Sequence, residues 1–217
     1  MMVADVKLAQ ALCSRLCHDL VGSVSAIGSG LELIAEDRSD IDGPLDLMSK
    51  SADQTARRLS FFRIAFGMAA GREGPASIEE VRQLSTDFFE GGRVRLGWRD
   101  SPDALADMTM PSVVTKILLN VLLLAAECLP RGGEVAIRIA RLPEGFGLAI
   151  EAIGEGARIP DEASNALANE ADSETVTPRN AHLHLARSLL ASIAGTIETE
   201  SEDAGTLRIA VLAPVSP

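Results

Sequence analysis

The sequence has little of what several protein classes depend on. Of its 217 residues none is tyrosine and only 3% are aromatic, so the core has to be aliphatic and rich in alanine. The three cysteines follow no disulfide or metal-ligand spacing, which favours reduced thiols in a cytoplasm. No apolar run reaches the roughly 18 residues of a membrane span, and no cationic start precedes an apolar segment. We therefore expect a cytoplasmic chain without a signal peptide.

Basic residues are scarce as well. The 20 Lys and Arg against 31 Asp and Glu give a formal net charge of -11, which argues against nucleic acid or an anionic membrane as a partner. A hydrophobic content of 47% and a mean hydropathy of +0.17 exclude a disordered chain. The composition therefore predicts a folded chain of one or two domains.

A long helical pattern runs over residues 4–36. Its apolar residues recur at steps of three and four, which is typical of the seam of a helical bundle. At about 100° per residue, His18 lies roughly 160° from the centre of this stripe, so we expect its imidazole to face water. Gly22 and Ser25 share that outer face, and small neighbours leave room for another protein. The stripe consists of Cys13, Leu16, Leu20, Val24, Ile27, Leu31 and Ile34.

A lone exposed histidine usually has no function, but the next residue here is an acid. The carboxylate of Asp19 could hold one ring nitrogen of His18 and leave the other as a neutral nucleophile. The alternative for Asp19 is a solvated acid or an ion pair with Arg15, four residues earlier.

A second helical pattern follows a turn at residues 37–44, with Pro44 at its expected first position. Two helices joined by a short turn form an antiparallel hairpin. Because a hairpin alone leaves one stripe uncovered, we expect two copies to pair into a dimeric four-helix bundle. Packing of both stripes on the rest of the same chain is the alternative. The second stripe consists of Leu45, Met48, Ala52, Thr55, Leu59, Phe62, Phe66 and Ala69.

Folding the hairpin about the middle of this turn places His18 level with Arg63. Side chains of the second helix that point away from the seam there predict a docking surface, although contact with the chain's own second domain is the alternative. Nearby basic residues would attract an acidic partner. The surface residues are Arg57, Phe61, Ile64 and Met68, and the basic residues are Arg15, Arg57, Arg58 and Arg63.

A glycine-rich break at residues 69–75 divides the chain into predicted domains 1–70 and 76–217. The second domain alternates between helices and strands, and mixed strands with helices on one face form a two-layer α/β sandwich. The fold class is therefore α+β. The expected helices cover residues 77–90, 112–129 and 179–194, and the expected strands cover 93–98, 134–141, 147–153, 196–200 and 206–212.

The run His18-Asp19-Leu20, followed by Ser25-Ala26-Ile27, resembles the phosphoacceptor box of two-component histidine kinases. The nearer resemblance is to the ChpT-type histidine phosphotransferases, which are similar to kinases that have lost ATP binding. Residues 58–67 resemble the second helix of that family. The resemblance covers nearly the whole chain, but its specific motifs lie in the first 70 residues.

The resemblance gives the second domain an ATP-binding-like fold, yet the nucleotide positions differ from those of kinases. Leu124 stands where kinases carry a magnesium-binding Asn, and a leucine offers no lone pair to a cation. Ala152 replaces the Asp that reads adenine, and residues 180–185 lack the glycines of a phosphate-cradling lid. We therefore predict neither ATP nor a metal. For His182 and His184, one packed ring and one solvated ring is a simpler interpretation than a metal pair.

The resemblance implies a phosphorelay, in which His18 accepts a phosphoryl group from one receiver-domain aspartate of a response regulator and passes it to another. Asp19 would orient the ring, nearby arginines would favour the phosphorylated imidazole, and the receiver would supply magnesium. Gly22 stands where phosphatase-active kinases carry Thr or Asn, which implies weak phosphatase activity. The alternatives are a non-catalytic dimeric adaptor that sequesters a receiver, and an ATP-dependent kinase. The residues assigned to receiver binding are Arg15, Gly22, Ser25, Arg57, Phe61, Arg63, Ile64 and Met68.

Overall fold

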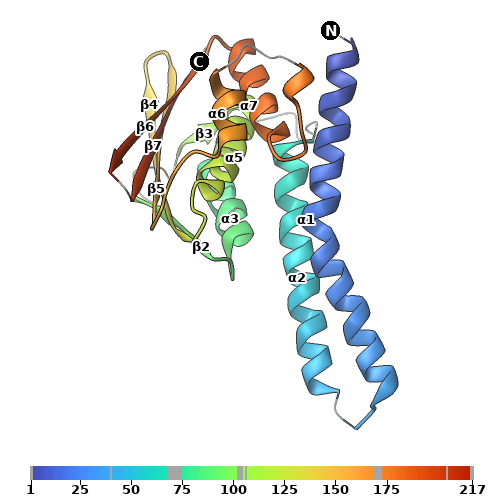
Figure 1. Ribbon diagram of the computed structural model, residues 1–217. Coiled ribbons are helices and arrows are strands. Elements are labelled where there is room, and N and C mark those ends of the chain that lie inside the picture. Colours follow the sequence, from blue (N-terminus) through green and yellow to red (C-terminus); the bar gives the residue numbers. More distant parts are fainter. Residues whose placement is uncertain are drawn as a thin grey trace.

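The computed structural model describes residues 2–39, 41–67, 75–101, 105, 107–168, 173–203 and 205–215. Two long helices form a hairpin that stands beside a five-stranded mixed sheet, and the remaining helices lie between the two (Figure 1). The predicted α+β class of the chain, with a helical hairpin and an α/β sandwich, is confirmed.

The hairpin consists of α1 (Met2–Glu36) and α2 (Asp42–Ala65). The helix α2 begins two residues before Pro44, which is tolerated there because the first N–H groups of a helix have no helical acceptor. The Ser23 hydroxyl donates to the Gln54 side chain at 2.7 Å and ties the middle of the hairpin. A Cβ at Gly30 would lie 2.4 Å from Cγ of Met48, so glycine permits the close approach near the turn.

The sheet has the strand order β2-β4-β5-β7-β6, with β2 parallel to β4 and every other pair antiparallel. Gly133, at φ 148°, opens β4 where a Cβ would lie 2.2 Å from the Ile153 carbonyl oxygen. The strands predicted from the sequence are therefore confirmed. Their bounds are β2 Val94–Trp98, β4 Gly133–Leu142, β5 Gly145–Ile153, β6 Thr196–Asp203 and β7 Thr206–Pro214.

The helices after the hairpin that lie wholly within the described residues are α3 (Ile78–Phe89), α5 (Ser112–Glu127), α6 (Asp161–Ala168) and α7 (Ala181–Ser192). Ser77 and Glu80 form a reciprocal capping box that begins α3. The helix α6 was not predicted, although the acids in its first turn, after Pro160, are a helix-start signal. A short pair of strands, β1 (Ala76–Ser77) and β3 (Thr109–Met110), and a 3-10 turn at Ser173–Thr175 were also missed.

The helix α5 lies at the centre of the core, because it packs on β5 on one side and on α2 and α7 on others. Nearly all of its residues from Val114 to Ala125 are buried, which explains why the longest apolar run of the sequence lies here. Phe61, Phe62 and Ala65 of α2 join the same hydrophobic cluster. The predicted boundary at residues 69–75 lies almost entirely outside the described residues. In the described part of the chain, no helix is long and apolar enough to cross a membrane.

Candidate functional site

His18 stands on the outer side of α1, with 86% of its side chain exposed. Its Nδ1 lies 3.2 Å from Oδ1 of Asp19, so the two neighbours are paired as expected. When Nδ1–H donates to this carboxylate, the lone pair of the neutral ring is on Nε2, which faces solvent. The local geometry therefore holds one ring nitrogen and presents the other.

Small residues lie on the same side of α1 as this imidazole, one and two turns further along the helix. Gly22 and Ser25 are both exposed, and a Cβ added at Gly22 would have no heavy atom within 4 Å. Val21, one turn after His18, is 58% exposed. Sequence reasoning missed Val21, although an apolar residue that lies off the seam, three positions after His18, is the signal that could have found it. These residues leave a clearing beside the ring with one apolar side chain at its edge.

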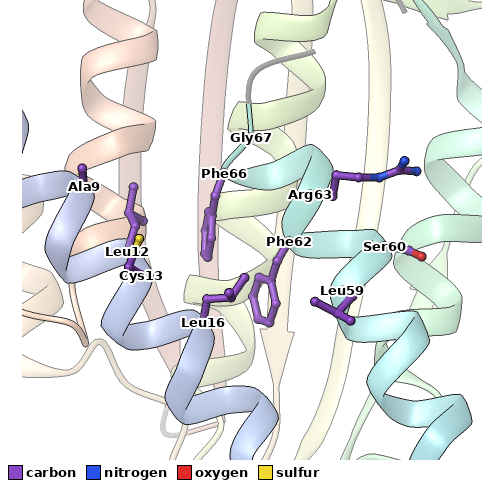
Figure 2. A pocket seen from close by; sticks show the side chains of 10 residues that line it. All are labelled: Ala9, Leu12, Cys13, Leu16, Leu59, Ser60, Phe62, Arg63, Phe66 and Gly67. Atoms are coloured by element: carbon purple, nitrogen blue, oxygen red, sulfur yellow. The ribbon is translucent and has the colours of Figure 1, made fainter. Parts of the chain in front are cut away.

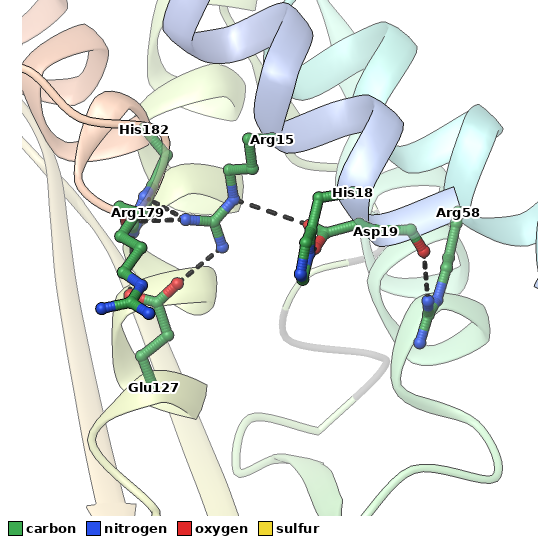
Figure 3. A network of polar contacts seen from close by, with 7 residues as sticks. All are labelled: Arg15, His18, Asp19, Arg58, Glu127, Arg179 and His182. Carbon is green, nitrogen blue, oxygen red and sulfur yellow. Dashed lines mark hydrogen bonds and ion pairs between the residues drawn. The ribbon is translucent and has the colours of Figure 1, made fainter. Parts of the chain in front are cut away.

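Arg15 does not lie free on this surface, because only 11% of its side chain is exposed. Its Nη2 donates to Glu127 at 2.6 Å, and its Nη1 donates to Nδ1 of His182 and to the Arg179 carbonyl oxygen, both at 2.8 Å (Figure 3). Nε of Arg15 lies 3.6 Å from Oδ2 of Asp19. The prediction that Arg15 binds a partner is therefore wrong for this structure, because the guanidinium is enclosed between α1, α5 and α7.

The alignment of the two hairpin helices differs by about one turn from the predicted one, in which His18 was level with Arg63. Nη1 of Arg58 donates to the Asp19 carbonyl oxygen at 2.5 Å, so Arg58 contacts the residue that follows His18. Arg63 is exposed, but it lies by the groove that contains Leu16, nearer the start of α1. Because the acceptor of Arg58 is a neutral carbonyl, the positive charge of Arg58 is not neutralised by this contact with Asp19.

The predicted docking surface on α2 is largely buried. Phe61 is 0% exposed and stacks on Phe88 of α3 at 4.0 Å between ring centroids, and Ile64 packs on the same cluster. Arg57 pairs with Glu90 at 2.6 Å. The structure instead has the alternative arrangement, in which this face of α2 contacts the chain's own second domain. Met68 lies outside the described residues.

Burial shifts the pKa values of His182, Glu127 and Cys128. Burial lowers the pKa of His182 well below its usual value, and the charge of Arg15 lowers it further, so the ring is neutral and Nδ1 accepts from Arg15. Burial also raises the pKa of Glu127, which Arg15 partly offsets. The pKa of the Cys128 thiol is raised to about 12 by burial and by the neighbouring Glu127.

This neutral His182 predicts an acid-sensitive stability. The unfolded chain binds a proton at this ring below about pH 6.5 and the folded chain does not, so the free energy of unfolding falls as the pH drops, by up to about 1.4 kcal/mol per unit. We expect the free energy of unfolding, measured with denaturant, to fall between pH 7 and pH 5. The fall should be about 1–2 kcal/mol larger for the parent chain than for its His182→Asn variant. Arg15, Glu127 and His184, which act on the ring, are unchanged in that variant. If the free energy of unfolding falls equally in the two proteins, the His182 ring is not buried in its neutral form.

His182 and His184 are both buried, at 0% and 6%, so the expectation that one ring faces solvent is wrong. Both lie in the first turn of α7, which α1 and α5 cover. Among the described residues, no group of three or more His, Cys, Asp or Glu side chains is placed to hold a metal ion.

The positions that would contact a nucleotide in a kinase are part of the core. Leu124 and Ala152 are both 0% exposed. The Nδ2 of Asn120 donates to the Ala65 carbonyl oxygen at 3.0 Å, so this amide satisfies a free carbonyl at the end of α2. These residues do not fit adenine or a magnesium ion, because apolar side chains fill the places where polar ligands are needed.

An apolar groove opens between α1 and α2 on the seam side of the hairpin. Its volume is about 600 Å³, and in Figure 2 Leu16 and Phe62 face each other across it, while Arg63 points away. The groove is therefore an uncovered part of the predicted bundle seam. Its lining residues are Ala9, Leu12, Cys13, Leu16, Leu59, Ser60, Phe62, Arg63, Phe66 and Gly67.

Comparisons with known proteins place the chain in a family. Residues 78–205 match the family model described as histidine phosphotransferase C-terminal domain. The protein phosphotransferase ChpT of Brucella abortus (strain 2308) is 34% identical over 137 residues, a match that spans 63% of this chain and 63% of that protein. The solved structure of a bacterial phosphotransferase has a TM-score of 0.81 and 26% identity, over 95% of this chain and 96% of that chain. Because the family model covers more than half of the sequence, this chain belongs to the histidine phosphotransferase family.

Proposed function

We propose that this chain is a phosphorelay carrier that moves a phosphoryl group between receiver-domain aspartates of response regulators through His18. The observation that carries the proposal is the exposed imidazole, with Nδ1 held by Asp19 and Nε2 open to a clearing of small residues. The family of the chain and its similarity to a protein named phosphotransferase support it. The free cysteines Cys13, Cys17 and Cys128 suit a reducing cytoplasm.

In the proposed first transfer, the lone pair on Nε2 of His18 attacks the phosphorus of an aspartyl phosphate. A P–N bond forms while the P–O bond breaks, and the aspartate leaves with the electron pair as a carboxylate. The second transfer reverses these steps on another receiver. Such transfers depend mainly on in-line positioning and charge neutralisation, and Arg58, which contacts the backbone of Asp19, supplies a positive charge at the neighbouring residue.

We propose that this chain uses neither ATP nor a resident metal, since Leu124 and Ala152 are buried apolar residues. Magnesium would be held by the receiver. Incubation with a phosphorylated receiver should place an acid-labile, base-stable label on this chain. Binding of the receiver without any label would support the alternative, an adaptor that sequesters receivers, and labelling by ATP alone would contradict the proposal.

We also propose that the chain pairs through its hairpin as a homodimer. Within the described residues, the large apolar side chains that stay exposed all lie between residues 6 and 59, within the hairpin, and several belong to the two seam stripes. Val24 and Leu31 of α1 are more than half exposed, and Leu45 and Leu59 of α2 nearly so. A second hairpin would cover these stripes and the groove between the helices.

The dimer is tested by an acidic residue in the seam. Leu59→Asp should weaken self-association by about 100-fold, because each copy would bury a carboxylate in an apolar interface. Leu47→Asp is the matched control, since Leu47 is similarly exposed on the same helix but lies off the seam. Light scattering over a concentration series should find dimers for the parent and the control. A monomeric parent, or equal effects of the two changes, would contradict this pairing.

The clearing beside His18 is tested at Gly22. Gly22→Phe should leave the fold intact, because nothing lies within 4 Å of the new Cβ, yet slow transfer from a receiver by about 10-fold or more by blocking its approach. Gly22→Ala should raise the free energy of unfolding by about 0.5–1 kcal/mol and leave transfer nearly unchanged.

Gly28→Phe is the matched control for the bulky change. Gly28 is equally open, and it lies about 9 Å further along the helix than Gly22 and about 15 Å from the level of His18. The transfer rate and the melting temperature are measured for the parent and for each variant. If the two phenylalanine variants transfer at the same rate, the clearing at Gly22 is not the docking site.

A further inference from the structure

The residues that enclose Arg15 come from the second part of the chain. Glu127 is the last residue of α5, Arg179 precedes α7, and His182 lies in the first turn of α7. Together they accept three hydrogen bonds from one guanidinium at 2.6–2.8 Å. The donors of a guanidinium are fixed in one plane, so several acceptors together determine its orientation. They would not determine the orientation of a lysine ammonium group in the same way. The orientation of Arg15 is therefore set by α5 and α7.

The other side of Arg15 is directed at the candidate site. Its Nε lies 3.6 Å from Oδ2 of Asp19, and Oδ1 of the same carboxylate lies 3.2 Å from Nδ1 of His18 (Figure 3). Among the described residues, Arg15 and His18 are the side chains that the Asp19 carboxylate pairs with. A continuous line of polar contacts thus runs from α5 and α7 to the exposed imidazole.

Local helix structure alone does not explain this line. An Arg that precedes an Asp by four residues is the less favourable order for a pair on a helix, and exposed pairs contribute little. Here the arginine is held from outside the helix, by groups whose sequence positions are more than 100 residues away. The contact between Arg15 and Asp19 therefore depends on the second part of the chain being in place.

We propose that Glu127 and His182 are positioning residues for phosphoryl transfer at His18, which act through Arg15 and Asp19; this rests on the proposed function. The beginning of α7 occupies the place of the nucleotide lid in the kinase pattern. In this chain it instead holds the arginine that fixes the carboxylate behind the imidazole. The second part of the chain contributes to transfer by orienting Nε2, and not by binding a nucleotide.

The test is a matched pair of substitutions at His182. Asn carries Oδ1 on the same Cγ branch as Nδ1 of His, so His182→Asn keeps an acceptor for Arg15, whereas His182→Leu has a similar shape and no acceptor. The rate of transfer from a phosphorylated receiver to this chain is measured over a range of receiver concentrations. We expect the Leu variant to be at least about 10-fold slower at saturation with an unchanged half-saturation concentration, and the Asn variant to stay within about 3-fold of the parent.

A melting curve for each variant separates positioning from unfolding. If the Leu variant does not fold, Arg15→Lys replaces it, because lysine keeps the charge but cannot contact Glu127, His182 and Asp19 together. The Lys variant should show the same loss of rate at saturation. A folded Leu or Lys variant that transfers at the parent rate would overturn the proposal, and so would equal losses in the Leu and Asn variants.

The behaviour of the parent protein distinguishes failure of the positioning role from failure of the proposed carrier function. If the parent accepts label and the His182→Leu variant is as fast, only the positioning role is lost. If the parent accepts no label from a receiver, the carrier function fails and the positioning role fails with it.

Discussion

We expect His18→Gln to reduce acceptance of a phosphoryl group from a receiver by at least about 1,000-fold. Glutamine keeps a polar side chain at an exposed helix position, but its amide nitrogen has no available lone pair for attack on phosphorus. The other two histidines of the sequence, His182 and His184, are both buried and cannot replace it. The measurement is the initial rate at which label leaves a phosphorylated receiver and appears on the chain.

Receiver binding is the control for this variant. Because the exposed imidazole packs against little of its own chain, His18→Gln should melt at the same temperature as the parent and bind an unphosphorylated receiver with a similar affinity. Label that persists on the variant would show that another residue accepts the phosphoryl group. Equal behaviour of parent and variant in a receiver-dependent assay would favour sequestration.

We expect Phe61→Ala to lower the free energy of unfolding by about 3–5 kcal/mol. Phe61 is fully buried, stacks on Phe88 at 4.0 Å and meets Phe62 edge-to-face at 5.8 Å. Its removal would leave a cavity where α2 packs on α3. The chain would lose both the free energy gained by burying the ring and its contacts with the two other aromatic rings. Urea unfolding, at a fixed chain concentration, measures the effect.

Leu47→Ala is the comparison for Phe61→Ala, since Leu47 lies on the same helix and is exposed. It should change the free energy of unfolding by no more than about 0.5 kcal/mol. A cost below about 1 kcal/mol for Phe61→Ala would mean that the ring is not part of the core, and it would restore the interpretation of this face as a docking surface.

The sequence predicted the helices and strands well because their signals are periodic and local. The alternation of three and four in α1 and α2, and the short apolar strands of the sheet, appear where they were expected. The same periodicity places His18 on the outer side of α1, where its side chain is exposed. Local signals, however, do not say what covers a given face.

That limit explains the errors about α2. An apolar side chain such as Phe61 or Ile64, off the seam, is equally compatible with a partner and with another part of the same chain. The alignment of the hairpin was wrong by one turn because α2 begins at Asp42 and not at Pro44, which moves the middle of the turn toward α1. Arg58, rather than Arg63, therefore lies beside Asp19.

The Arg15 network was beyond sequence reasoning for a different reason. Its partners Glu127, Arg179 and His182 are separated from Arg15 by more than 100 residues, and no periodic pattern joins them. His182 and His184 could be interpreted from the sequence only as a weak metal pair or as packing residues. Only the fold places the start of α7 against α1.

A relay assay with two receivers tests the central claim most directly. One receiver is labelled with phosphate on its aspartate and freed of nucleotide, a second is unlabelled, and the chain is added at about one hundredth of their concentration. We predict that label passes through an acid-labile intermediate on His18 and accumulates on the second receiver over many turnovers, and that the His18→Gln variant transfers none. Label that remains on the first receiver, or that moves only when ATP is present, would contradict this account.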